Sequence, residues 1–529
     1  MEVLRDLPGI NSLLGAGIYG LLPAILLYLV NAIFLNVASP KGVAFIREPL
    51  GKSSFSLKTR LAYLTDCESI FREAYQNYLK KGQAVMVPGF GVRNELLLPP
   101  SSMPWVMKQP ETDLSVSDAF LDLDQADYSL GHSKYIGDAW QGLLVKTEMN
   151  VVLENIVAAM NDELGVAFDK YLGTGEETWK TIDLLETARM VVAQAGSRFT
   201  IGLPLCRNEQ YLRDCLDAID GCVINAGVTG GMPPILRPIL GPLVGLKARL
   251  ANRKVRQHFE PIYRERLETL SFAKDDPNHP EPQDLMQMML RFAQRQRPHE
   301  LYDLKNIGTR LTAANFGSMH QTSIQVTNIL LNILGSDAEY NTMAVLRDEV
   351  AQILGDDDRW TKAKVSKMVK TDSVARETLR CHSFGGRAVF RKVMVDGVET
   401  DDGVKLPKGS LFSFLSQAAH MDEDIYKDAH KYDPFRFSRV REAATGSSTT
   451  SPLSFVSTSP DYLAFSHGKH ACPGRFLIDF ELKMIIAYVL THYDIKFPEE
   501  YDNKRPANRW MAEAMTPPEG VKLLVRRRK

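Results

Sequence analysis

The sequence predicts a mainly α-helical fold with a small β-sheet region, preceded by a separate N-terminal membrane helix. Most of the chain after residue 140 carries apolar residues at three- and four-residue spacing, which is typical of helices packed on a core. Strand-like alternation is confined mainly to residues 388–395, and the turn signals Asp402-Gly403 and Lys408-Gly409 follow it. Because 44% of the 529 residues are hydrophobic, the chain can bury a large core.

The N-terminal 40 residues form the first predicted unit. No charged residue lies between Asp6 and Lys41, and residues 13–35 are almost wholly apolar. A helix of that length crosses a hydrocarbon core of about 30 Å, and membrane helices tolerate a proline such as Pro23. A cleaved signal peptide is the alternative, although the apolar run is long for one and no basic segment precedes it.

Basic residues follow this apolar run more often than they precede it. Only Arg5 precedes it, whereas Lys41, Arg47, Lys52, Lys58 and Arg60 follow closely. The positive-inside rule then places the following chain in the cytosol. We therefore expect a single-pass anchor over residues 1–40 and one catalytic domain over residues 41–529.

Within the second unit, helical patterns cover residues 145–172, 182–195, 244–268, 301–334, 340–354 and 372–382. Pro261 is expected to kink or break the third of these helices. Residues 232–243 hold four prolines and are expected to form a loop or a broken segment, whereas residues 273–284 and 445–460 are polar surface segments. The net charge of −1 gives no argument for nucleic-acid binding, and the six scattered cysteines fit a reducing compartment.

The most specific motif is the run from residue 465 to residue 475, Phe-Ser-His-Gly-Lys-His-Ala-Cys-Pro-Gly-Arg. Pro473 is expected to be the first residue of a helix, which places Cys472 at or beside the N-cap. The helix dipole and the unpaired N–H groups there favour a thiolate with a lowered pKa, as a metal ligand requires. Gly468 and Gly474 allow the backbone to lie close to a flat ligand.

Two other interpretations of Cys472 remain open on these residues alone. Free cysteines are often buried and inert. His467, His470 and Cys472 could also form a zinc site, but no CxxC and no second ligand pair lies at zinc-site spacing.

The run resembles the haem-binding loop of the cytochrome P-450 superfamily, F-x-x-G-x-[HR]-x-C-x-G. Phe465, Gly468, His470, Cys472 and Gly474 occupy its fixed positions. The resemblance implies the cytochrome P-450 fold and haem b with Cys472 as the axial iron ligand, whose thiolate favours O–O cleavage.

Two further segments match the superfamily in the expected order. Glu377 and Arg380 lie on one helix face, and residues 432–437 resemble a P-x-R-F segment. In the superfamily these residues form a buried triad behind the haem, which here is Glu377, Arg380 and Arg436. A buried charge triad is tolerable only when it is fully paired.

The resemblance also suggests residues for the haem propionates. Arg391 matches a strand arginine that binds one propionate, with Arg387 as the alternative, and His470 takes the other position. The W-x-x-x-R contact from an earlier helix is missing, and Lys146 is a substitute candidate.

The helix over residues 301–334 carries the expected oxygen-handling residues. The pattern [AG]-G-x-[DE]-T-[TS] aligns with residues 317–322, but Ser318, His320 and Gln321 depart from it, while Thr322 follows. His320 titrates in a useful range for a proton relay, and Gln321 can orient water. Alternatively, both are polar residues satisfied within a helix–helix contact.

By this resemblance the protein is a membrane-anchored haem-thiolate monooxygenase of a hydrophobic small molecule, performing hydroxylation, epoxidation or multi-step oxidation. The chain also resembles fungal secondary-metabolite members of the superfamily, which implies terpenoid, polyketide or alkaloid biosynthesis. The family resemblance further implies the endoplasmic reticulum membrane. O₂ would be the co-substrate, and electrons from NADPH would come through a reductase docking near Lys469 and Arg475, with cytochrome b5 as a further donor. Residues 103–120, 384–390 and 508–515 would line the pocket.

Two alternatives belong to other functional classes. Gln321 in place of the usual threonine motivates an isomerase or a ring-forming oxidase that retains the haem but inserts no oxygen. A non-catalytic haem or lipid carrier would also retain the loop and the triad.

Overall fold

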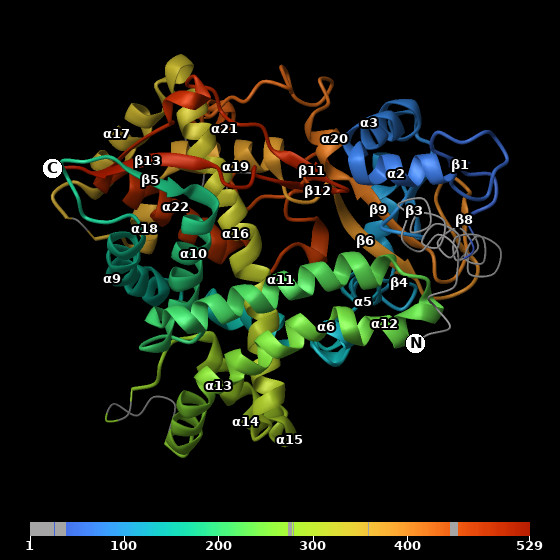
Figure 1. Ribbon diagram of the computed structural model, residues 1–529. Coiled ribbons are helices and arrows are strands. Elements are labelled where there is room, and N and C mark those ends of the chain that lie inside the picture. The colour runs from blue at the N-terminus through green and yellow to red at the C-terminus, as the bar shows by residue number, and fades with distance from the viewer. Residues whose placement is uncertain (1–25, 27–38, 273–277, 279, 358, 445–452) are drawn as a thin grey trace, which may run out of the picture.

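The computed structural model describes residues 26, 39–272, 278, 280–357, 359–444 and 453–529. Helices gather around one long central helix, α16 (Leu304–Tyr340), and a β-sheet lies at one side of the molecule (Figure 1). The prediction of a mainly helical fold with a small sheet region is therefore confirmed.

The other main helices follow the chain from the sheet side to the C-terminal core. They are α2 (Leu57–Thr65), α3 (Cys67–Asn77), α4 (Met103–Lys108), α5 (Val116–Asp124), α8 (Trp140–Leu144), α9 (Leu153–Tyr171), α10 (Leu184–Thr200), α11 (Glu209–Gly231), α12 (Arg237–Val244), α13 (Leu246–Thr269), α14 (Leu285–Gln296), α17 (Thr342–Leu354), α19 (Val369–His382), α20 (Ser416–His420), α21 (Arg436–Ala443) and α22 (Arg475–His492).

Helix α16 organises the core because it contacts helices on several sides. It packs against α10, α11, α13, α17, α19 and α22. The Asp303 side chain caps its N-terminus by accepting the Asn306 N–H, and Asn341 ends it in the left-handed conformation at φ 50°. Gly308 lies inside this helix because Phe259 of α13 leaves no room for a Cβ there.

The main sheet has six strands in the order β1-β2-β3-β9-β6-β4. We expected an antiparallel sheet from the C-terminal half, but four of its strands come from the N-terminal part and two of its pairs, β1–β2 and β3–β9, are parallel. The short N-terminal strands carried too few residues to give an alternation signal. The strands are β1 (Ala44–Phe45), β2 (Val85–Pro88), β3 (Asn94–Leu97), β4 (Leu114–Ser115), β6 (Arg387–Val393) and β9 (Leu411–Leu415).

Smaller sheets complete the β structure. The predicted turn at Asp402-Gly403 joins β7 (Val398–Glu399) to β8 (Lys405–Leu406). Strands β11 (Arg509–Met511) and β12 (Ala514–Thr516) form a hairpin, and β10 (Tyr493–Lys496), β13 (Lys522–Arg527) and β5 (Lys180–Asp183) form a three-stranded sheet.

Two helices contain prolines where the sequence predicted a break or a loop. Helix α13 continues through Pro261, and α12 covers the later part of the segment 232–243, with Pro238 in its first turn and Pro242 inside it. A proline in the first turn removes no helical hydrogen bond, and an interior proline is tolerated where packing fixes the helix. Helix α11 shows such packing, because Gly221 lets Ala248 of α13 approach it closely.

The predicted membrane span, residues 13–35, lies outside the described residues apart from Leu26. Among the residues that the structure describes, no helix combines the length and the apolar composition needed to cross a bilayer.

The close contact of α11 with α13 gives a stability prediction. A Cβ on Gly221 would lie 2.7 Å from the Ala248 backbone, so Gly221→Ala must push the two helices apart. We expect a loss of about 1–3 kcal/mol in unfolding free energy, measured by chemical denaturation. Gly142→Ala is the control, since a Cβ there meets nothing within 4 Å, and equal stabilities of the two variants would contradict tight packing at Gly221.

Candidate active site

The cysteine loop is a tight turn ahead of α22. The Cys472 N–H donates to the Phe465 carbonyl at 2.9 Å, and Arg475 Nη1 donates to the Cys472 carbonyl at 2.8 Å. Gly468 has φ 73°, and a Cβ on it would lie 2.7 Å from the Met107 sulfur. The loop therefore needs glycine at this position both for its conformation and for its contact with α4.

Two details of the loop differ from the expectation. Helix α22 begins at Arg475 with Gly474 as its N-cap, so Pro473 lies in the preceding turn and Cys472 is two residues from the cap. Burial raises the pKa of the Cys472 thiol, and the lowering by the N–H groups of Gly474 and Arg475 and by the Arg475 charge does not overcome it. The predicted low pKa is therefore wrong for the polypeptide alone, because desolvation outweighs the helix terminus.

A group of cations lies beside the loop. Arg391 of β6 is 4% exposed, and its Nη1 donates a hydrogen bond to the carbonyl of the neighbouring Phe390 at 2.8 Å. Burial lowers the pKa of His470, and the nearby charges of Arg391, Lys469 and Lys146 lower it further. His470 Nε2 lies 3.2 Å from Glu111 Oε2 but without hydrogen-bond geometry.

These groups fit a ligand that carries carboxylates. Burial lowers the pKa of Arg391, opposed only by Glu111, so among the described residues this cation has weak compensation. An unpaired buried cation is costly, and an anionic group beside Arg391 and His470 would relieve that cost. The residues present therefore fit the propionate groups of haem b.

Arg387 does not join this group. Its guanidinium forms ion pairs with Glu95 of β3 and Glu513 of the β11–β12 turn, and its side chain is 1% exposed. The alternative assignment of a propionate to Arg387 is therefore not supported by the geometry.

The face of α16 that carries the predicted oxygen-handling residues is partly open. Gly317 and Gln321 are exposed, and a Cβ on Gly317 would meet nothing within 4 Å, whereas Thr322 is buried. His320 stacks on Phe316 and meets the edge of Phe384 at a centroid distance of 5.3 Å. No described residue forms a hydrogen bond with its Nε2, and burial lowers the pKa of the ring, which favours neutral imidazole.

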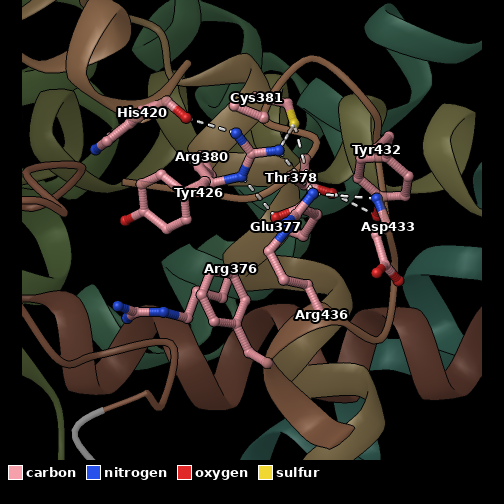
Figure 2. A network of polar contacts seen from close by, with 12 residues as sticks. Arg376, Glu377, Thr378, Arg380, Cys381, His420, Tyr426, Tyr432, Asp433 and Arg436 are labelled. Carbon is pink, nitrogen blue, oxygen red and sulfur yellow. Dashed lines mark hydrogen bonds and ion pairs between the residues drawn. The ribbon is translucent and has the colours of Figure 1, made fainter. Parts of the chain in front are cut away.

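The structure brings Glu377, Arg380 and Arg436 together (Figure 2). Arg380 donates two hydrogen bonds of 2.8 Å to the Glu377 carboxylate, and Arg436 Nε donates a third at 3.1 Å. Glu377 and Arg380 have 0% exposed side chains, and the two arginines also donate to backbone carbonyls, including His420 O and Lys427 O.

The sequence analysis missed Arg376, which borders this network. Its guanidinium lies 3.6 Å from the centroid of the Tyr462 ring and donates to the carbonyls of Ser454 and Ser457. It thereby ties α19 to the segment that leads into the cysteine loop. Only its position one residue before Glu377 could have pointed to it.

Parts of the segments expected to line a pocket lie together. The Phe120 and Phe390 ring centroids are 6.0 Å apart, and Met515 N–H donates to the Phe384 carbonyl at 2.7 Å. Among the described residues no group of three or more His, Cys, Asp or Glu side chains could hold a metal ion, so no zinc-type ligand set forms at Cys472.

A single cysteine before a core helix, a long helix opposite and a buried Glu-Arg-Arg network define the helical haem-thiolate class of proteins. The sequence model of the family described as cytochrome P450 matches residues 143–525, and the chain belongs to this family. It is 52% identical over 515 residues to cytochrome P450 monooxygenase pbrC of Penicillium brasilianum, covering 96% of each chain. It is 51% identical to cytochrome P450 monooxygenase astC of Aspergillus terreus, covering 94% of each, and 46% identical to cytochrome P450 monooxygenase tenB of Beauveria bassiana, covering 91% of each.

The buried network gives a prediction on folding. Glu377→Gln leaves Arg380 and Arg436 without a counter-charge, so we expect a loss of about 3–5 kcal/mol in unfolding free energy. Denaturation followed by circular dichroism, together with the amount of haem retained, measures it.

Glu209→Gln is the matched control, because Glu209 pairs with Arg213 on the surface at 2.7 Å. Glu209→Gln should lower the unfolding free energy by less than about 1 kcal/mol. Similar losses in the two variants would show that the buried network has no special importance.

Proposed function

We propose that the protein is a haem-thiolate monooxygenase that oxidises a hydrophobic small molecule, such as a terpenoid, polyketide or alkaloid, in secondary-metabolite biosynthesis. The observation that carries the proposal is the tight loop that holds Cys472, with His470 in the same loop and the buried cation Arg391 close enough to lower the pKa of His470. Haem b, when bound, would supply the oxygen activation, with the Cys472 thiolate holding its iron and O₂ as the co-substrate.

Residues 317–322 of α16 would position the substrate or O₂ and handle protons in the pocket. Gly317 and Ser318 keep the α16 face small, and the exposed Gln321 would orient water beside it. Burial lowers the pKa of His320, and among the described residues its Nε2 has no hydrogen-bond partner, which suits a group that passes a proton toward the pocket. Thr322 is buried, and its hydroxyl is a further candidate for the proton relay.

A haem-thiolate monooxygenase needs an electron donor, and the N-terminal segment suggests a membrane. Electrons would come from an NADPH-dependent reductase, with cytochrome b5 as a second donor, at the face near Lys469 and Arg475. Residues 1–40 would anchor the chain in the endoplasmic reticulum membrane, with residues 41–529 in the cytosol. Exposed apolar side chains on and beside α12, namely Ile235, Ile239, Leu243, Leu246 and Leu250, support contact with the bilayer.

The departure at Gln321 favours one second candidate, an isomerase or ring-forming oxidase that inserts no oxygen. Incubation with a reductase, NADPH and ¹⁸O₂ separates the two. A labelled product supports the monooxygenase, whereas an unlabelled product supports the alternative.

The thiolate assignment is tested by spectroscopy. The reduced, CO-treated protein should show the red-shifted Soret band that gives the family its name, and Cys472→His should abolish it, because imidazole is a weaker electron donor than thiolate. Cys222→Ser is the control, since Cys222 is also only partly buried, and it should retain the band. A band that survives in Cys472→His would overturn the assignment.

The relay role of His320 predicts a loss of coupling. His320→Leu should lower product formation on the order of a hundredfold and raise the share of NADPH that ends as hydrogen peroxide, because a proton donor is lost. Microsomes with a reductase and an accepted terpenoid or polyketide measure both quantities. Ser318→Ala should leave the coupling unchanged, and unchanged coupling in His320→Leu would assign His320 to packing against Phe316 and Phe384.

A further inference from the structure

The hairpin β11–β12 is held to the central helix by one arginine at its stem. Arg505 precedes β11, and its Nε donates to Asn332 Oδ1 at 2.5 Å, while Nη2 donates to Asn328 Oδ1 at 2.9 Å. Nη2 also donates to Asn508 Oδ1 at 2.9 Å, inside the stem itself. One guanidinium therefore joins the hairpin stem to two successive turns of α16.

Helix α16 is shaped to receive this side chain. Asn328, Asn332 and Gly335 are spaced i, i+4 and i+7, so they lie on one face of the helix. A Cβ on Gly335 would lie 2.9 Å from the Arg505 Cβ, so only glycine leaves room for the arginine. We call these three residues the amide seat.

The amide seat holds a cation without a carboxylate. Burial lowers the pKa of Arg505 to about 10, and only Tyr432 and Cys381 oppose this effect. The planar guanidinium meets amide oxygens at fixed angles, so the contact has direction although it lacks a counter-charge. A contact of this kind fixes a position more than it adds stability.

The amide seat is also connected to the pocket. Asn332 Nδ2 donates to Thr378 Oγ1 at 3.0 Å and lies 3.2 Å from His382 Nδ1. Two residues after His382, the Phe384 carbonyl accepts the Met515 N–H of β12, and the Phe384 ring lies against His320. The stem and the second strand of the hairpin are therefore both attached near the C-terminal end of α19, at His382 and Phe384.

The turn of the hairpin has its own attachment. Glu513 pairs with Arg387 of β6, and the Glu513 carbonyl accepts the Gly386 N–H at 3.0 Å. The turn is thus fixed to the sheet, while Arg505 links the stem to α16.

We propose that Arg505 is a positioning residue that holds β11–β12 as a fixed wall of the substrate pocket, so that the pocket selects substrates by size and shape. This inference rests on the proposed function and on the expectation from the family resemblance that residues 508–515 line the substrate pocket. The position of this wall is then set by Arg505, which lies outside residues 508–515 and contacts α16.

Backbone hydrogen exchange tests the positioning directly in the full-length haem-loaded protein. Arg505→Gln should speed amide exchange at residues 510–516 by about tenfold or more, because the stem loses its contacts with α16. Arg509→Gln, which changes an exposed arginine within the hairpin, should leave exchange unchanged. Equal exchange in Arg505→Gln and the unchanged protein would overturn the proposal.

Azole binding tests the consequence for ligands. A bulky azole such as clotrimazole reaches the pocket wall, whereas imidazole reaches only the iron. Arg505→Gln should weaken clotrimazole binding by about tenfold and change imidazole binding less than about twofold. Equal weakening of both ligands, or of neither, would contradict a role in shaping the wall.

Asn328→Asp separates positioning from charge. It places a carboxylate on Arg505 and keeps the contact, so exchange and clotrimazole binding should match the unchanged protein. Faster amide exchange together with weaker clotrimazole binding in Asn328→Asp would overturn the proposal. If the unchanged protein lacks the red-shifted CO band, the proposed function fails, and the exchange result still decides whether Arg505 fixes the hairpin.

Discussion

The carboxylate of Glu377 is the single group around which the half of the molecule behind Cys472 is assembled. Its two oxygens accept from Arg380, Arg436 and the Asp433 backbone N–H, so the charge is shared among α19, α21 and the turn before it. The two arginines extend the network to the carbonyls of His420 and Lys427. A carboxylate buried this deeply is stable only when every partner is present, so the segments must fold together.

Helix α19, which carries Glu377, also contacts the segment that leads into the cysteine loop. Arg376, one residue before Glu377, holds the carbonyls of Ser454 and Ser457 and the ring of Tyr462, all of which precede Phe465 along the chain. Helix α16 also packs on α19. The positions of the loop and of the open α16 face are therefore both set from α19.

The sequence predicted the features that depend on local patterns. Cys472, Gly468 and Gly474 form a contiguous motif, and Glu377 with Arg380 follows helical spacing, so both were recognisable. Arg505 and Glu111 were not, because their importance comes from residues more than 170 and 350 positions away, Asn332 and His470. The pKa of Cys472 was misjudged for a related reason: a helix terminus can be inferred from the sequence, but the depth of burial that opposes it cannot.

Arg391 and Arg505 show two ways of keeping a cation inside a protein. Arg505 is supplied with amide oxygens by the chain, whereas Arg391 has one neighbouring backbone carbonyl and a distant influence from Glu111. The folded polypeptide therefore carries an electrostatic cost at Arg391 that only an anionic ligand removes, and binding and folding are thermodynamically linked. The cellular level of the mature enzyme should then follow the supply of its prosthetic group as well as the expression of its gene.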